Sequence, residues 1–173
     1  MEIVKKLIID TKENIQKYLS NVKVETNSIK SFDIKWNENE ILDLIEKTGK
    51  VKGPTLYWFE IVSKIENEVI INSLRKYSRE KDAKKTPVES KKSNDKSKIL
   101  YVGKVKENFT RRFKQHLGEY PAKTTQGLQL QHWAKEIDLR LNYFEFDENM
   151  KDLLAVFEIE LANQLKPILG IHK

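Results

Sequence analysis

Arg112 and His116 are the residues whose types and spacing most directly suggest chemistry. They stand four positions apart in a segment whose apolar residues Phe109 and Phe113 recur at helical spacing, so they lie one turn apart beside a core-facing stripe. A strand that ends in Tyr101-Val-Gly precedes this helix. A guanidinium and an imidazole beside a strand-end phenol would form a site for a phosphate group. The alternative is a basic surface helix whose arginine lies along apolar surface with its charged end in water.

Glu158 is a further candidate because it interrupts the apolar face of the last predicted helix. It stands four residues after Leu154 and three before Leu161, whereas Glu160 points away from that face and is expected to be solvated. A carboxylate on a core-facing stripe is costly unless it is paired or binds a cation. Glu158 is therefore either the partner of a buried arginine, for which Arg112 is available, or the ligand of a metal ion.

Residues 78–98 form a basic stretch in which Lys and Arg outnumber Asp and Glu and apolar residues are almost absent. Such a stretch cannot offset its ordering entropy by burial, so it is predicted to be a mobile loop. It is either a solvated linker or an arm that follows a phosphate backbone. The candidate nucleic-acid contacts are Lys84, Lys85, Lys91 and Lys92 of this stretch and Arg111 and Lys114 of the helix after it.

Alternating strands and helices would position these residues. Alternation and β-branched or aromatic content predict strands, and helical periodicity predicts helices. Residues 51–173 thus predict an α/β domain with a small central β-sheet flanked by helices. The strands are expected at 54–62, 99–104 and 139–146, and the helices at 67–77, from about 107 to 117, at 126–137 and at 150–165.

The N-terminal third, residues 1–50, is predicted to be a helical extension. An amphipathic helix is expected over 2–22, an alternating strand over 31–36, and then a helix that Asn37 or Asn39 caps and Gly49 ends. No residue of this part suggests chemistry. We expect the extension to pack on the main domain, with contact to a target as the alternative.

Composition restricts the classes of site and partner. The chain has 173 residues, a net charge of +6 and no cysteine. The absence of cysteine excludes disulfides, thiolate metal sites and cysteine nucleophiles, and it fits a cytoplasmic protein. The three histidines are too scattered to predict a zinc cluster. No stretch is long and apolar enough to cross a bilayer, and the positive charge favours a polyanionic partner.

The candidate residues, taken in order, resemble the motifs of the GIY-YIG nuclease family. Thr55-Leu-Tyr57 corresponds to Gly-Ile-Tyr, and Tyr101-Val-Gly103 corresponds to Tyr-Ile-Gly. Arg112 matches the family arginine, and Glu158 matches the family glutamate, with Pro167 as its downstream proline. The resemblance covers about residues 54–170 and implies a GIY-YIG-like fold.

The resemblance implies a Mg²⁺- or Mn²⁺-dependent DNA endonuclease of a restriction, repair or mobile-element type. Glu158 would hold the metal ion, and Arg112 would bind the non-bridging phosphate oxygens with its fork of donors. A rival for this role is Arg111, because one extra residue separates the glycine of the second motif from Arg112.

Four further residues would take part in proton transfer or phosphate binding. Tyr57 is the expected general base, and Tyr101 lines the site. Because a free phenol has a pKa near 10, a nearby cation such as Lys104 would have to activate the base. Lys104 resembles a lysine of the excision-repair branch of the family. His116 would assist proton transfer or hold the phosphate.

Two departures from the family pattern are expected to matter. The two motif strands normally form a hairpin, whereas here an insertion at about 64–98 separates them. Many family members have an asparagine just after the proline, where this chain has Gly170, and Asn163 comes too early to replace it.

Two alternatives to the enzyme remain open at the level of sequence. One is a catalytically weak or inactive GIY-YIG-like module that binds nucleic acid. The other is an unrelated α/β domain whose basic loop binds RNA or a protein, and a large separation between Arg112 and Glu158 would favour it. The oligomeric state is not predicted.

Overall fold

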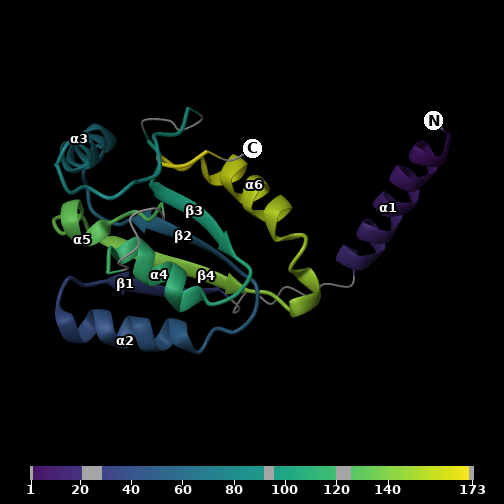
Figure 1. Ribbon diagram of the computed structural model, residues 1–173, viewed down its shortest axis with the longest axis horizontal. Coiled ribbons are helices and arrows are strands. Elements are labelled where there is room, and N and C mark those ends of the chain that lie inside the picture. The colour runs from purple at the N-terminus through teal and green to yellow at the C-terminus, as the bar shows by residue number, and fades with distance from the viewer. Residues whose placement is uncertain (1, 21–28, 92–95, 120–125, 172–173) are drawn as a thin grey trace.

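The computed structural model describes residues 2–20, 29–91, 96–119 and 126–171, apart from the side chain of residue 18 (Figure 1). Its helices and strands alternate along most of the chain, as the sequence predicts. In chain order they are α1 (Glu2–Ser20), β1 (Lys30–Ile34), α2 (Glu38–Gly49), β2 (Thr55–Ile61), α3 (Asn67–Ser78), β3 (Ile99–Val105), α4 (Phe109–Leu117), α5 (Leu130–Trp133), β4 (Leu139–Glu145), the 3-10 helix η2 (Glu148–Met150) and α6 (Leu154–Leu165).

The four strands form one antiparallel sheet in the order β1-β4-β2-β3. Tyr57 in β2 lies opposite Gly103 in β3 on one side and opposite Tyr143 in β4 on the other. β3 is the last strand of this sheet, and the C-terminal segment runs along the first part of its outer side, where Ile168 N–H donates to Ile99 O at 2.8 Å and Leu169 N–H donates to Leu100 O at 2.9 Å.

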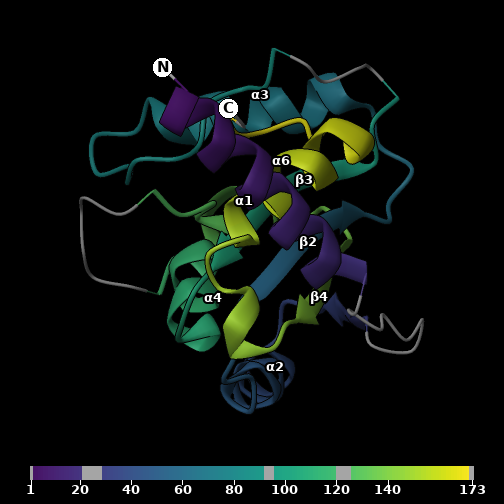
Figure 2. The same cartoon turned by 90° about the vertical axis from the view of Figure 1, so that its right-hand side faces the viewer.

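Alternate residues of the strands face two helical layers. Tyr57 and Phe59 are fully buried on the face that carries α4, where their rings contact His116. Helix α6 lies against β2 and β3 from the other face, where Phe157 stacks on Phe146 (Figure 2). The α/β fold with a small central sheet between helices is thereby confirmed.

The N-terminal third does not form one separate extension. β1 pairs with β4 in the main sheet, and α2 packs against α4, so residues 30–49 belong to the same layers as the rest. The physical reason is that β1 contributes Ile34 to the core, while Asn37 caps α2 by accepting a hydrogen bond from Glu40 N–H at 3.0 Å. Asn37, and not Asn39, is the capping residue.

Helix α1 differs from its expected packing. It extends over Glu2–Ser20, and the last two residues of the predicted helix fall outside the described ranges. Figure 1 shows it apart from the sheet and from α2 to α6, and its apolar residues are exposed. No helix among the described residues is long and apolar enough to cross a membrane.

The basic stretch is more ordered than its composition predicts over residues 83–91. Ser90 N–H donates to Ile168 O at 2.8 Å, and Gly170 N–H donates to Val88 O at 2.8 Å. Pro87 is buried, and Arg75 of α3 pairs with Glu89. The C-terminal segment thus supplies the backbone partners that the composition of this stretch could not reveal.

Two predicted helices are shorter in the structure. The helix expected over 126–137 is reduced to α5, because the chain from Gln126 to Leu128 is extended and Gln129 has a φ of 59°. Gly127 explains this path: a Cβ there would lie 2.0 Å from Gln115 O, so the segment packs tightly on α4. The last helix begins at Leu154, since residues 148–150 form η2.

Candidate active site

Tyr57 is the centre of a buried polar cluster on the α4 side of the sheet. Its ring crosses the backbone of Gly103 on the neighbouring strand. A Cβ at Gly103 would lie 2.5 Å from Tyr57 Oη and 2.7 Å from Tyr101 Cε1. The glycine of the second motif is therefore required by the close approach of both phenol rings.

The Tyr57 hydroxyl is held by two side chains of α4. His116 Nε2 lies 2.8 Å from Tyr57 Oη, and Arg112 Nε donates to the same oxygen at 3.0 Å. The other ring nitrogen of His116, Nδ1, accepts the backbone N–H of Leu128 at 3.2 Å. A neutral imidazole has one acceptor and one donor nitrogen, so Nε2 carries the proton and donates to Tyr57.

The surroundings fix the resting protonation of this pair. Burial, together with the positive charge of Arg112, holds the pKa of His116 well below its usual value. Burial, then the neighbouring Tyr101, raises the pKa of Tyr57, and Arg112 offsets only part of the rise. At neutral pH His116 is therefore neutral and Tyr57 keeps its proton. Because the Tyr57 oxygen accepts two hydrogen bonds, its own proton points to a third partner.

Most of the N–H donors of the Arg112 guanidinium are used in hydrogen bonds to other residues of the chain. Besides Tyr57, it donates to Gln115 Oε1 and Gln126 O at 3.0 Å each, and to Tyr101 Oη at 3.5 Å. A guanidinium has five N–H donors, so these four bonds leave one donor for a phosphate oxygen. Arg112 thus sits beside the phenols as predicted, but the two-donor fork expected for a phosphate is directed at the protein.

The local sequence explains how α4 presents these side chains. Asn108 caps the helix by accepting the Arg111 N–H at 3.1 Å, and the helix ends at Gly118 in a left-handed conformation. Phe109 and Phe113 are buried on its inner face, so Arg112 and His116 turn toward the sheet while Arg111 is exposed. Arg112 is therefore the arginine that joins the phenol cluster.

Lys104 and Glu158 form an ion pair between β3 and α6. The Glu158 side chain is 14% exposed and that of Lys104 33%. The expected partner of Glu158 was Arg112; the structure pairs it with Lys104, because Arg112 is occupied on the α4 side of the sheet. Lys104 directly follows Gly103, which both phenol rings approach, and the Glu158 charge contributes to the raised pKa of both Tyr57 and Tyr101.

The donor set for a metal ion is a single carboxylate. Within the described ranges, no three His, Asp or Glu residues are grouped as metal ligands. Mg²⁺ in nucleic-acid enzymes is commonly held by one or two carboxylates, with water and substrate phosphates completing its shell. Glu158, poorly solvated and already paired with a cation, fits this role.

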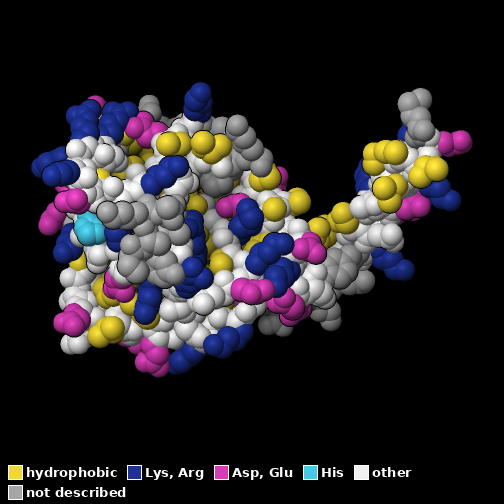
Figure 3. Space-filling view, viewed as in Figure 1, with side chains coloured by type: hydrophobic (Ala, Val, Ile, Leu, Met, Phe, Trp, Pro, Cys, Tyr) yellow, Lys and Arg dark blue, Asp and Glu magenta, His cyan; other side chains and the backbone are white. Residues whose placement is uncertain are grey.

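The predicted nucleic-acid contacts are spread over two regions. Arg111 is exposed and Lys114 half-buried on α4, and Figure 3 shows Lys and Arg side chains over α4 and near the end of β3. Lys84 donates to Gly118 O at 3.1 Å, so it ties the insertion to α4. Lys85 and Lys91 are exposed, and Lys92 lies outside the described residues.

Sequence reasoning missed three groups that complete the cluster. They are the Gln115 side chain, the Gln126 carbonyl and the Leu128 N–H, which bond Arg112 or His116. Two of the three are backbone groups, and their part in the cluster cannot be predicted from the type of residue that carries them. Gln115 could have been noticed because it is a buried polar residue three positions after Arg112.

The absent family asparagine has a structural explanation. Gly170, at the corresponding place, is buried and has a φ of 109°, a conformation that favours glycine. Its N–H joins the insertion through Val88 O. Asn163 is exposed on α6.

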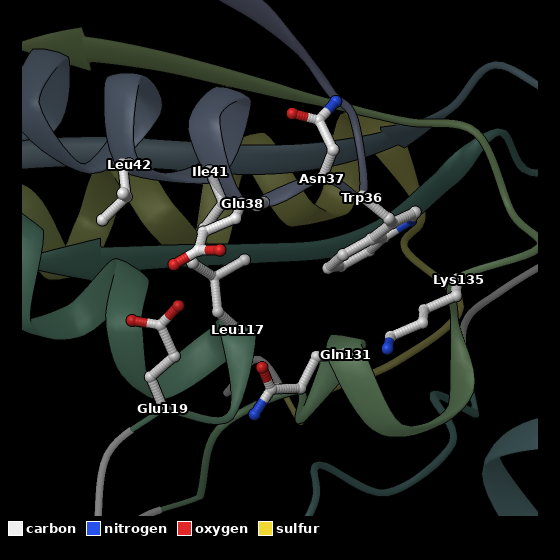
Figure 4. A pocket seen from close by; sticks show the side chains of 9 residues that line it. All are labelled: Trp36, Asn37, Glu38, Ile41, Leu42, Leu117, Glu119, Gln131 and Lys135. Atoms are coloured by element: carbon white, nitrogen blue, oxygen red, sulfur yellow. The ribbon is translucent and has the colours of Figure 1, made fainter.

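A separate hollow of about 280 Å³ lies between the start of α2, the end of α4 and the α5 region (Figure 4). Trp36, Gln131 and Lys135 line it, and none of the predicted catalytic residues does. The candidate active site is therefore the phenol cluster with the Lys104–Glu158 pair, not this hollow.

Comparison with known proteins gives one match. Residues 89–170 match the family model of the GIY-YIG catalytic domain. This range contains β3, α4, β4 and α6, and with them Tyr101, Arg112, His116 and Glu158, whereas β2 with Tyr57 precedes it. No curated protein and no solved structure matches the chain.

Proposed function

We propose that this chain, whose residues 89–170 match the family model of the GIY-YIG catalytic domain, is a Mg²⁺-dependent endonuclease that hydrolyses phosphodiester bonds of DNA. The family supports a nuclease activity in general. The observation that carries the specific proposal is the convergence of two α4 side chains, Arg112 and His116, on the phenol oxygen of Tyr57 in β2.

The scissile phosphate would lie at the edge of β3, between the phenols and Glu158. The remaining N–H of Arg112 and the Tyr101 hydroxyl can donate to its oxygens, and Lys104 adds a positive charge. These groups neutralise the charge that develops on the pentacoordinate phosphorus. A Mg²⁺ or Mn²⁺ ion at Glu158 would supply Lewis-acid stabilisation of the same charge and of the leaving oxygen.

Tyr57 is the proposed general base. Its oxygen accepts hydrogen bonds from Arg112 and His116, and both bonds stabilise the phenolate once the phenol proton has left. His116 acts through Tyr57: it fixes the direction of the oxygen, while the Leu128 N–H fixes the imidazole tautomer. The cation beside the proposed base is therefore Arg112, whereas Lys104 forms an ion pair with Glu158.

Cleavage of supercoiled plasmid in Mg²⁺ tests this proposal. Glu158→Gln should lower the nicking rate at least about 100-fold, because it removes the metal-binding charge. Glu160→Gln is the matched control: Glu160 is on the same helix but exposed, so the rate should not change. DNA binding without cleavage by any of the three proteins would instead support a binding module.

Substrate preference would distinguish the biological roles. Restriction, repair and mobile-element enzymes differ in the DNA that they recognise, so plasmids, damaged duplexes and branched duplexes are compared under the same conditions. A matched RNA duplex tests the proposal that DNA is the substrate.

A further inference from the structure

Helix α1 has an apolar face that the described residues leave largely uncovered. Ile3 is 83% exposed, and Leu7 and Ile8 are each 62% exposed. Leu19, near the end of the helix, shares a surface hollow with Phe157 and Leu161 of α6. Most of the stability of a helix in a protein comes from packing of its apolar face, and a large exposed apolar face marks an interaction site.

The spacing of this face is that of a two-helix seam. Val4, Ile8, Thr11 and Ile15 follow one another at intervals of four, three and four residues, which is the heptad pattern of a coiled coil. Ile8 and Ile15 take the position at which β-branched residues favour parallel pairs. A hollow along the helix is lined by four apolar residues, Leu7, Ile8, Ile15 and Leu19, together with Thr11, Lys12 and Gln16.

The size of the face suits a pair of such helices. A helix of 19 residues is about 28 Å long and about 12 Å across with its side chains, so half of its surface is roughly 500 Å². Two copies would bury roughly 1,000 Å², the area at which a specific interface becomes plausible.

The charges of α1 favour a second copy over an anionic surface. The polar side carries both signs along its length, with Glu2, Asp10 and Glu13 among its lysines. A helix that binds anionic lipid has a predominantly basic polar face instead. In a parallel pair, Lys5 and Lys12 of one copy lie beside the seam. They face Leu7 and Asn14 of the other copy, which carry no charge, so the lysines do not repel each other.

We propose that α1 is a dimerisation helix, and that two copies of this chain associate in parallel through its Val4–Ile15 seam. The proposal does not depend on nuclease activity. If the chain does cut DNA, the dimer would bring two active sites to one duplex.

Light scattering on the full chain tests the association. The wild type should have twice the 20.4 kDa mass of the chain at micromolar concentration. Ile8→Asp with Ile15→Asp should halve this mass, whereas Lys6→Gln with Lys17→Gln, which changes the net charge equally on the polar side, should keep it. All three tryptophans lie outside α1, so unchanged tryptophan emission shows that the catalytic domain is folded. A monomeric wild type, or a dimer that survives both aspartates, would overturn the proposal.

Cross-linking tests the seam directly, because the chain has no cysteine of its own. Thr11→Cys places a thiol on the seam, and Glu13→Cys places one on the opposite side of the same helix. Oxidation should convert most of the Thr11→Cys protein, but little of the Glu13→Cys protein, to a covalent dimer. Equal cross-linking of the two variants would contradict the seam.

Discussion

At the scale of single residues, the chemistry depends on one phenol oxygen with two fixed donors. Arg112 and the Nε2 proton of His116 occupy the Tyr57 oxygen, and burial raises the pKa of the phenol. The two donors favour the phenolate, whereas burial favours the neutral form, and burial dominates. The proposed base is therefore protonated at rest, and only a small fraction of it is present as the phenolate.

A rising pH–rate profile follows from the raised pKa of Tyr57. Below that pKa, the phenolate fraction increases tenfold with each pH unit, so single-turnover cleavage should accelerate about tenfold per unit between about pH 7 and 9. Cleavage of a labelled duplex at constant Mg²⁺ measures this. A rate independent of pH would show that Tyr57 keeps its proton during the reaction.

His116 should make the fold sensitive to mild acid. Its folded-state pKa is lowered by burial and by Arg112, so below about pH 6.5 the unfolded chain binds a proton that the folded chain does not. The free energy of unfolding should fall by up to about 1.4 kcal/mol per pH unit from pH 6.5 down to the folded-state pKa.

Urea unfolding at pH 7.5 and 5.5 measures this loss, and His116→Gln should remove most of it. His132→Gln is the control, because the pKa of His132 is also lowered but its side chain is exposed. An equal pH dependence in the wild type and His116→Gln would contradict the assignment.

At the scale of elements, the site exists because β2 and β3 approach each other and α4 lies across them. Gly103 allows the Tyr57 and Tyr101 rings to cross the β3 backbone, and α4 then brings Arg112 and His116 to the phenols. The 126–129 segment completes the cluster, because it supplies the Gln126 carbonyl and the Leu128 N–H.

Gly103→Ala should therefore disable the site. The new methyl would lie 2.5 Å from Tyr57 Oη, so the Tyr57 ring would have to move. A displacement of the proposed base by about 1 Å should lower the cleavage rate about 100-fold. Overpacking should also lower the free energy of unfolding by about 1–3 kcal/mol. Gly49→Ala is the control, since its methyl would meet Thr110 at an ordinary 3.6 Å. Full cleavage by Gly103→Ala would contradict the geometry.

The sequence predicts elements that have their own periodic pattern and misses those that depend on other segments. The strands around Tyr57 and Tyr101 and the helix with Arg112 are predicted within one or two residues. The 126–137 helix is not formed as predicted, because tight packing of Gly127 on α4 overrides local propensity. Likewise, the Lys104 partner of Glu158 depends on how α6 meets an edge strand, which no spacing within α6 encodes.

At the scale of the molecule, the charge distribution should make DNA binding depend on salt. Exposed Arg111 and half-buried Lys114 lie on the same helix as Arg112, the proposed phosphate ligand, and each lost phosphate contact lowers the salt slope of log K by about 1. Arg111→Gln with Lys114→Gln should thus weaken binding and flatten the slope. Lys135→Gln, beside the hollow of Figure 4, should bind like the wild type. Equal slopes for all the proteins would contradict this interface.

The most direct test of the account is the single-turnover cleavage rate of Tyr57→Phe in Mg²⁺. This change removes only the oxygen on which Arg112 and His116 converge. Tyr143→Phe is the matched control, because Tyr143 is the buried cross-strand neighbour of Tyr57. We predict a loss of at least about 100-fold for Tyr57→Phe with unchanged DNA binding, and no loss for Tyr143→Phe. Cleavage by Tyr57→Phe at the wild-type rate would contradict the account.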